Sequence, residues 1–211
     1  MRIDFFFDPM CPWCWITSRW IVEVEPQRDL EVHWRTFSLL EKNRDRMPAE
    51  YLDRVSAGHN ALRVAEALRA EEGERAVGMF YTELGARIHH DRVPADEIEL
   101  ATVLRNVGLS RDIVSVADDT KWDTAIRASM DEGIALAGED VGVPLISFDR
   151  KTAYFGPVVT PAPHGDAALQ LWDSVATLAQ FPGFYELKNS ARAKPEFGQR
   201  PIVARLSGSS S

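Results

Sequence analysis

The chain has 211 residues, of which 45% are hydrophobic and 27% are charged, enough to bury a sizeable core in one domain or in a domain with a large insertion. Its 24 basic and 32 acidic residues give a formal net charge of -8, which argues against broad attraction to nucleic-acid backbones or anionic membrane surfaces. No apolar run approaches the roughly 20 residues that cross a bilayer. We therefore expect neither nucleic acid nor membrane as a partner.

The chain opens on a short apolar stretch, Arg2–Phe7, whose length suits one buried strand. It is too short for the core of a signal peptide and has Asp4 and Asp8 inside or beside it. We therefore expect a cytoplasmic protein. In that reducing compartment the two cysteines of the chain, Cys11 and Cys14, are expected to be catalytic or metal-binding rather than a structural disulfide.

The two cysteines lie where a predicted strand gives way to a predicted helix. After Asp8-Pro9, the apolar pairs Trp15-Ile16 and Trp20-Ile21 recur at a spacing that places them on one helix face. A second strand is predicted over residues 30–40, followed by a polar stretch over 41–48. The chain therefore begins with a β-α-β pattern.

The middle and the end of the chain differ in their patterns. Helical spacing predicts helices over residues 51–70, 76–89, 95–107 and 111–130. Strand patterns return over 143–148 and 152–155, and a last helix is predicted over 165–179. This order predicts an α/β thioredoxin fold, β-α-β followed by β-β-α, with a large all-helical insertion. We expect a thioredoxin-like domain from residues 1–45 and 140–205, an inserted helical domain from 46–139 and a disordered tail from 206–211.

The motif Cys11-Pro12-Trp13-Cys14 occupies the predicted helix start. A thiolate is the nucleophile of disulfide exchange, and the N–H groups and dipole at a helix N-terminus stabilise its charge. Pro12 suits the first turn, where it loses no hydrogen bond. Cys14 lies about one turn further on the same face, within reach of a mixed disulfide on Cys11. We predict that Cys11 attacks with a lowered pKa, that Cys14 resolves, and that Trp13 offers substrate a flat apolar surface.

A zinc site is the alternative interpretation of two cysteines at this spacing. A structural zinc site needs four ligands, and the chain has no further cysteine. The histidines include no pair separated by three to five residues; they are His33, His59, His89, His90 and His164. The sequence therefore favours redox chemistry without a metal.

Residues 7–15, which read FDPMCPWCW, together with Val143-Pro144 far downstream, resemble the DsbA family of thioredoxin-fold proteins. Further motifs are similar to the cytoplasmic mycothiol-dependent nitroreductase branch over nearly the whole chain. They are WITSRW at 15–20, NRD at 43–45, RIH at 87–89, GEDVG at 138–142, FGP at 155–157 and FYELK at 184–188.

The resemblance implies a dithiol enzyme that the low-molecular-weight thiol mycothiol reduces, and that passes electrons to small-molecule or protein disulfides or, in that branch, to nitro-aromatic compounds. It implies no flavin and no other tightly bound cofactor. It also implies that Pro144 is cis and that its loop faces the cysteines, so that the backbone of Val143 is presented to substrate. By itself, Pro144 reads as a strand-starting proline. Val143 departs from the threonine expected in that branch, which removes a hydroxyl beside the cysteines.

Asn43 and His89 match motif positions of the resemblance, which predicts that they line a substrate pocket. The sequence also allows plain structural roles. Asn43 suits a cap or a turn, and His89 suits a helix end, where the helix dipole favours its protonated form.

Two other functions stay open at this point. Kappa-class glutathione transferases and 2-hydroxychromene-2-carboxylate isomerases share the fold, but typically use a serine near the position of Cys11 and need no second cysteine, so Cys14 argues against them. A chaperone-like protein that binds partners through the helical block is the other alternative, and no residue pattern demands it.

Overall fold

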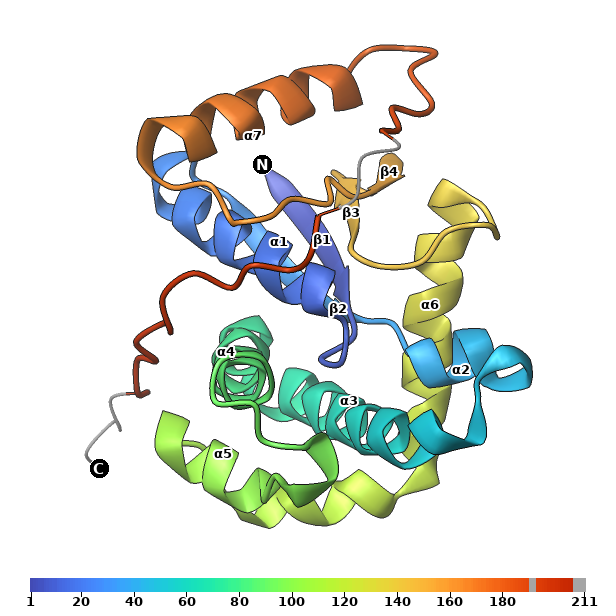
Figure 1. Cartoon of the computed structure of the whole chain (residues 1–211), viewed down its shortest axis with the longest axis vertical. Helices are drawn as coiled ribbons and strands as arrows, with labels where there is room; N and C mark the ends of the chain where they lie inside the picture. Colours follow the sequence, from blue (N-terminus) through green and yellow to red (C-terminus); the bar gives the residue numbers. More distant parts are fainter. Residues whose placement is uncertain (190–192, 207–211) are drawn as a thin grey trace. The chain divides into compact units, whose positions relative to one another are not determined.

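The computed structural model describes residues 1–189 and 193–206, and its elements follow the predicted order (Figure 1). Short 3-10 segments join the helices and strands, which are β1 (Arg2–Phe7), α1 (Pro12–Val24), β2 (Glu31–Thr36), α2 (Leu39–Asn43), α3 (Leu52–Glu72), α4 (Glu74–His89), α5 (Leu100–Val107), α6 (Asp123–Ala137), β3 (Leu145–Phe148), β4 (Thr152–Phe155) and α7 (Gly165–Ala179). Among the described helices, none has the length and apolarity needed to span a membrane.

Two predicted elements end differently from the expectation. The strand predicted over residues 30–40 stops at Thr36, because the Ser38 hydroxyl accepts the Glu41 backbone N–H at 3.1 Å and caps α2. The helix predicted over 111–130 is a run of 3-10 turns until α6 begins at Asp123. There, the carboxylate of Asp119 accepts the Lys121 N–H at 3.1 Å and starts a new turn.

The chain forms two compact units, each described here by itself. The thiol unit comprises residues 1–7, 11–35 and 130–198, and the helical unit comprises residues 8–10 and 36–129 with the described part of 199–211. These boundaries differ from those predicted, because residues 8–10, 36–45 and 199–206 lie with the helical unit. Of the predicted tail, residues 207–211 are outside the described residues, and the Leu206 N–H donates to the Val107 carbonyl at 3.0 Å.

A four-stranded sheet in the order β2-β1-β3-β4 forms the centre of the thiol unit. Strand β1 runs antiparallel to β3, with Ile3 opposite Phe148 and Phe6 opposite Leu145, and β3 forms an antiparallel hairpin with β4. Because side chains alternate along a strand, these two pairs face opposite sides of the sheet. The central strands are apolar on both faces, which is the signature of a sheet covered on both sides.

Helices α1 and α7 pack together within the thiol unit (Figure 1). Trp20 of α1 stacks at 5.8 Å on Trp172 of α7 and donates its ring N–H to the Ala168 carbonyl at 2.9 Å. The C-terminal half of α6 covers the other side of the sheet. Gly133 makes this approach close, because a Cβ there would lie 2.9 Å from Leu145 and 3.0 Å from Phe6.

Glycines define the helix ends in the helical unit. Gly73, with a φ of 84°, ends α3 and precedes α4, and Gly108 ends α5 in the left-handed conformation. The apolar faces of α3, α4 and α5 form the core of this unit. Its fully enclosed side chains include Leu62, Val64, Val77, Val103 and Leu104.

Candidate active site: a cysteine pair at the start of helix α1

Cys11 is the residue that caps the N-terminus of α1. Its backbone is extended, with φ -81° and ψ 112°, and Pro12 occupies the first helical position, as the sequence predicts. The Cys11 sulfur accepts the backbone N–H of Cys14 at 3.3 Å. A side chain in this position receives a helix N–H and the positive end of the helix dipole, and both stabilise a thiolate.

The two cysteines differ in access. Neither belongs to a disulfide bond. Cys11 is 5% exposed, whereas Cys14 is fully enclosed. Only the Cys11 sulfur therefore has an edge that an incoming molecule can reach without opening the helix.

The Val143–Pro144 peptide bond is cis, as the resemblance implies. The Cys11 thiol donates to the Val143 carbonyl at 3.5 Å, so this loop lies against the cysteine that caps α1. On the far side of Pro144, its carbonyl accepts the Gly156 N–H at 2.8 Å. Two further cis bonds, Gly156–Pro157 and Thr160–Pro161, carry no sequence signal and were not predicted.

A profile of the Rv2466c-like family, described as "Mycothiol-dependent nitroreductase Rv2466c", matches residues 10–189. The chain belongs to this family. A curated relative, "Uncharacterized protein Rv2286c" from Mycobacterium tuberculosis (strain ATCC 25618 / H37Rv), is 33% identical over 189 residues, which cover 88% of this chain and 80% of that protein. The chain is thus a DsbA-like thiol oxidoreductase of the Rv2466c-like family.

Solved structures share the fold of this Rv2466c-like chain at low identity. "Cytosolic disulfide reductase DsbM from Pseudomonas aeruginosa" gives a TM-score of 0.58 at 13% identity, covering 85% of this chain and all of that chain. A 2-hydroxychromene-2-carboxylate isomerase also gives 0.58 at 13% identity, covering 85% of this chain and 97% of that one. They establish a DsbA-like thioredoxin fold with a helical insertion. Since a reductase and an isomerase match equally well, the fold alone does not select a reaction.

Pro12 and Trp13 lie half-buried in the first turn of α1, beside the cysteine that caps it. The tryptophans expected in the core are buried: Trp15 and Trp20 are fully enclosed and Trp34 is 5% exposed. Trp13 is the tryptophan of α1 that keeps exposed surface. Its predicted contact with substrate stays a prediction for this Rv2466c-like protein.

Asn43 and His89 belong to the helical unit, and the structure gives each a protein partner. Asn43, half-buried at the end of α2, donates its side-chain amide to the Leu39 carbonyl at 3.1 Å. His89 is the last residue of α4 and donates its Nε2–H to the Pro9 carbonyl at 2.9 Å. Burial lowers the pKa of His89 to about 4. The expectation that the helix end favours its protonated form is therefore wrong, because desolvation outweighs the dipole.

Asp8 is a residue that the sequence analysis did not single out. It is fully enclosed, and its two carboxylate oxygens accept the N–H groups of Met10 and Leu39, both at 2.7 Å. Burial raises the pKa of Asp8 to about 6 despite these two hydrogen bonds. An acidic residue directly after an apolar strand, three positions before a reactive cysteine, is a signal that could have identified it.

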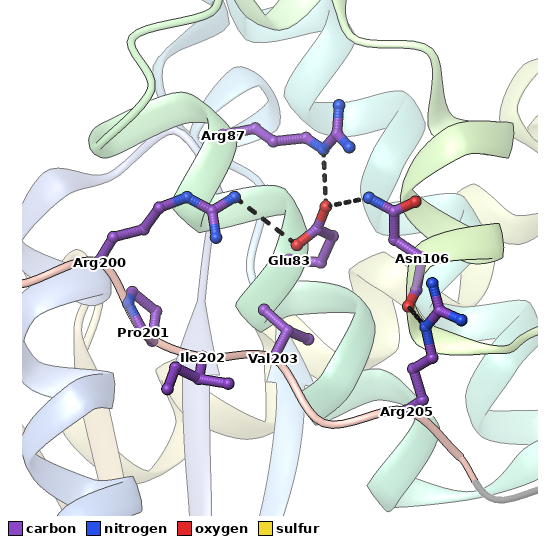
Figure 2. A pocket seen from close by; sticks show the side chains of 8 residues that line it. All are labelled: Glu83, Arg87, Asn106, Arg200, Pro201, Ile202, Val203 and Arg205. Carbon is purple, nitrogen blue, oxygen red and sulfur yellow. Dashed lines mark hydrogen bonds and ion pairs between the residues drawn. The ribbon is translucent and has the colours of Figure 1, made fainter.

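A hollow of about 550 Å³ in the helical unit lies beneath residues 200–205 (Figure 2). The buried carboxylate of Glu83 accepts Arg87 at 2.9 Å and Asn106 at 2.8 Å, and Arg200 lies 3.8 Å away. The Arg205 guanidinium donates to the Asn106 carbonyl at 3.1 Å. These charges satisfy one another and hold the C-terminal segment, and the hollow contains no thiol. Among the described residues, no three His, Cys, Asp or Glu side chains are grouped as metal ligands.

Proposed function

We propose that this protein is a thiol-disulfide oxidoreductase in which Cys11 attacks, Cys14 resolves and mycothiol restores the dithiol. The observation that carries the proposal is the position of the Cys11 sulfur. It caps α1, accepts the Cys14 N–H at 3.3 Å and belongs to the cysteine that is not fully enclosed. Membership of a family described as mycothiol-dependent supports mycothiol as the reductant.

The proposed cycle moves two electrons and two protons. The Cys11 thiolate attacks one sulfur of a substrate disulfide, forms a mixed disulfide and expels the first substrate thiol. Cys14 then attacks the Cys11 sulfur, expels the second substrate thiol and leaves the Cys11-Cys14 disulfide. Two mycothiol molecules reverse this change, the first by forming a mixed disulfide with the protein and the second by leaving as mycothiol disulfide.

A nitro-aromatic compound is the second proposed acceptor. The dithiol transfers two electrons and two protons to the nitro group, which becomes a nitroso group and releases one water, while the cysteines become a disulfide. The half-buried ring of Trp13 supports this proposal, because it presents an aromatic surface within two residues of the attacking sulfur. Val143, in place of the expected threonine, offers no hydroxyl there and favours apolar substrates.

Reduction is the proposed direction, in the cytoplasm. The decisive measurement is the reduction potential of the Cys11-Cys14 pair, with mycothiol and glutathione each tried as the reductant. We expect a potential below about -200 mV and faster reduction by mycothiol than by glutathione. A potential near about -120 mV, the region of disulfide-forming oxidases, would contradict the proposed direction.

Cys14→Ser separates this function from the transferase or isomerase alternative. We expect the variant to stop after one mixed disulfide and to lose multiple turnover with disulfide substrates, because no second thiol completes the exchange. Cys11→Ser serves as the matched control and loses the first step as well. Full turnover by Cys14→Ser would favour a reaction that needs one activated thiol only.

A further inference from the structure

The three residues before Cys11 are held by the helical unit at three points. The Asp8 carboxylate accepts the Leu39 N–H at the start of α2 and the Met10 N–H. His89 at the end of α4 donates to the Pro9 carbonyl at 2.9 Å. Gly58 of α3 lies so close to Met10 that a Cβ on the glycine would overlap with the Met10 side chain. We call this arrangement, residues 8–10 with Leu39, Gly58 and His89, the clamp.

The clamp is built from buried polar groups. Asp8 is fully enclosed and His89 is 6% exposed, and a buried polar group is expensive unless it is hydrogen-bonded. Both Asp8 oxygens accept a backbone N–H, and a carbonyl accepts a hydrogen only from the protonated ring nitrogen, so His89 is the Nε2–H tautomer. The raised pKa of Asp8 and the lowered pKa of His89 agree with this enclosure.

The residue after the clamp is the proposed nucleophile. Cys11 keeps its sulfur on the Cys14 N–H only while its own backbone stays extended at the cap position. The peptide plane before Cys11 sets where that backbone begins, and the clamp fixes the carbonyl of Pro9 and the N–H of Met10. A hydrogen bond at the end of α4 therefore constrains the cap of α1 through two intervening residues of chain.

We propose that Asp8, Gly58 and His89 are positioning residues that hold the chain before Cys11 and thereby keep its sulfur at the start of α1. This inference rests on the proposed function in one respect, that Cys11 is the attacking thiol. The helical unit then has a chemical task besides covering substrate: it controls the ionisation of a cysteine that lies outside it in the chain.

The test measures the ionisation of Cys11 alone, in a Cys14→Ser background, from the pH dependence of iodoacetamide alkylation. His89→Leu removes the donor to Pro9. We expect it to raise the pKa of Cys11 by about half a unit or more, which slows alkylation near neutral pH about threefold. His89→Gln carries an N–H near the position of the histidine Nε2 and is expected to restore most of the parent rate.

Two further variants exclude a simple loss of stability. Val103→Ala makes a cavity in α5 of the same unit, away from the clamp, and is expected to lower the melting temperature without shifting the Cys11 profile. Gly58→Ala forces Met10 to move and is expected to shift the profile although the variant removes no hydrogen bond. It also serves as the decisive variant if His89→Leu does not fold.

The inference is overturned if neither His89→Leu nor Gly58→Ala changes the Cys11 profile, or if Val103→Ala changes it as much as they do. The proposed function is judged on a separate quantity, the Cys11 pKa of the parent. A parent value at or above about 8.5, the pKa of an ordinary free cysteine, would count against the activated nucleophile. The comparison between variants would still decide whether the clamp acts on Cys11.

Discussion

The helical unit contains two buried histidines, and their surroundings differ in kind. Both ring nitrogens of His59 have side-chain partners: the Ser38 hydroxyl at 2.8 Å and the Asp123 carboxylate at 3.0 Å. Arg63 also donates to Asp123, at 2.6 Å, and lowers the pKa of that carboxyl. His89 instead donates to a backbone carbonyl, that of Pro9.

This difference indicates two uses of buried polar groups in one unit. The His59 network joins the segment before α2, helix α3 and the start of α6 to one another, and each partner lies in the helical unit. The His89 contact joins α4 to the chain that leads into Cys11. The first arrangement stabilises the unit, whereas the second also influences the candidate active site.

The largest expected effect on stability is that of His59→Leu. The substitution leaves Ser38 and Asp123 buried with one partner fewer, and removing one member of a buried charged network costs about 3–5 kcal/mol. Urea unfolding at neutral pH measures the loss. His59→Gln, which can keep one hydrogen bond, is the control and is expected to lose less. A loss below about 1 kcal/mol for His59→Leu would contradict the structural role assigned to the network.

A smaller effect concerns pH, because Asp8 and His89 titrate in opposite senses. The pKa of His89 falls from 6.5 to about 4 on folding, so its contribution to stability is lost as the pH drops below 6.5. The pKa of Asp8 rises from 3.8 to about 6, so acidification below pH 6 stabilises the folded state until the unfolded chain also binds the proton near 3.8. In the parent the two contributions largely cancel between these values.

Separate variants expose the cancellation. On going from pH 7 to pH 5, the unfolding free energy of His89→Gln is expected to change more favourably than that of the parent, by about 2 kcal/mol. That of Asp8→Asn is expected to change less favourably, by about 1 kcal/mol. Urea unfolding of the three proteins at both pH values measures these differences. Changes of the same sign in both variants would contradict the opposed titrations.

The sequence predicted the parts of this molecule that depend on local patterns. The strand Arg2–Phe7, the cap position of Cys11, the helix that begins at Pro12 and the final helix Gly165–Ala179 all follow from apolar spacing and from residues with strong positional preferences. The cis bond before Pro144 was predicted only through resemblance, because most X-Pro bonds are trans.

The clamp was not predicted, because its partners are far apart in the chain. Pro9 and His89 are 80 residues apart, and Asp8 and Leu39 are 31 apart, and no periodicity reports such pairs. The same reason explains the unit boundaries. Residues 8–10 look like the end of a strand and residues 199–206 look like a tail, yet long-range contacts such as that of Leu206 with Val107 place both segments in the helical unit.

The most direct test of the proposed function is a mixed-disulfide trap with mycothiol disulfide, read by mass spectrometry of the intact protein and its peptides. In the Cys14→Ser protein, we expect one mycothiol adduct, on Cys11, because the attacking thiol reacts and no resolving thiol releases the product. In the Cys11→Ser protein, the enclosed Cys14 is expected to react far more slowly. No adduct on Cys11, or equal rates in the two variants, would contradict the assignment of Cys11 as the nucleophile.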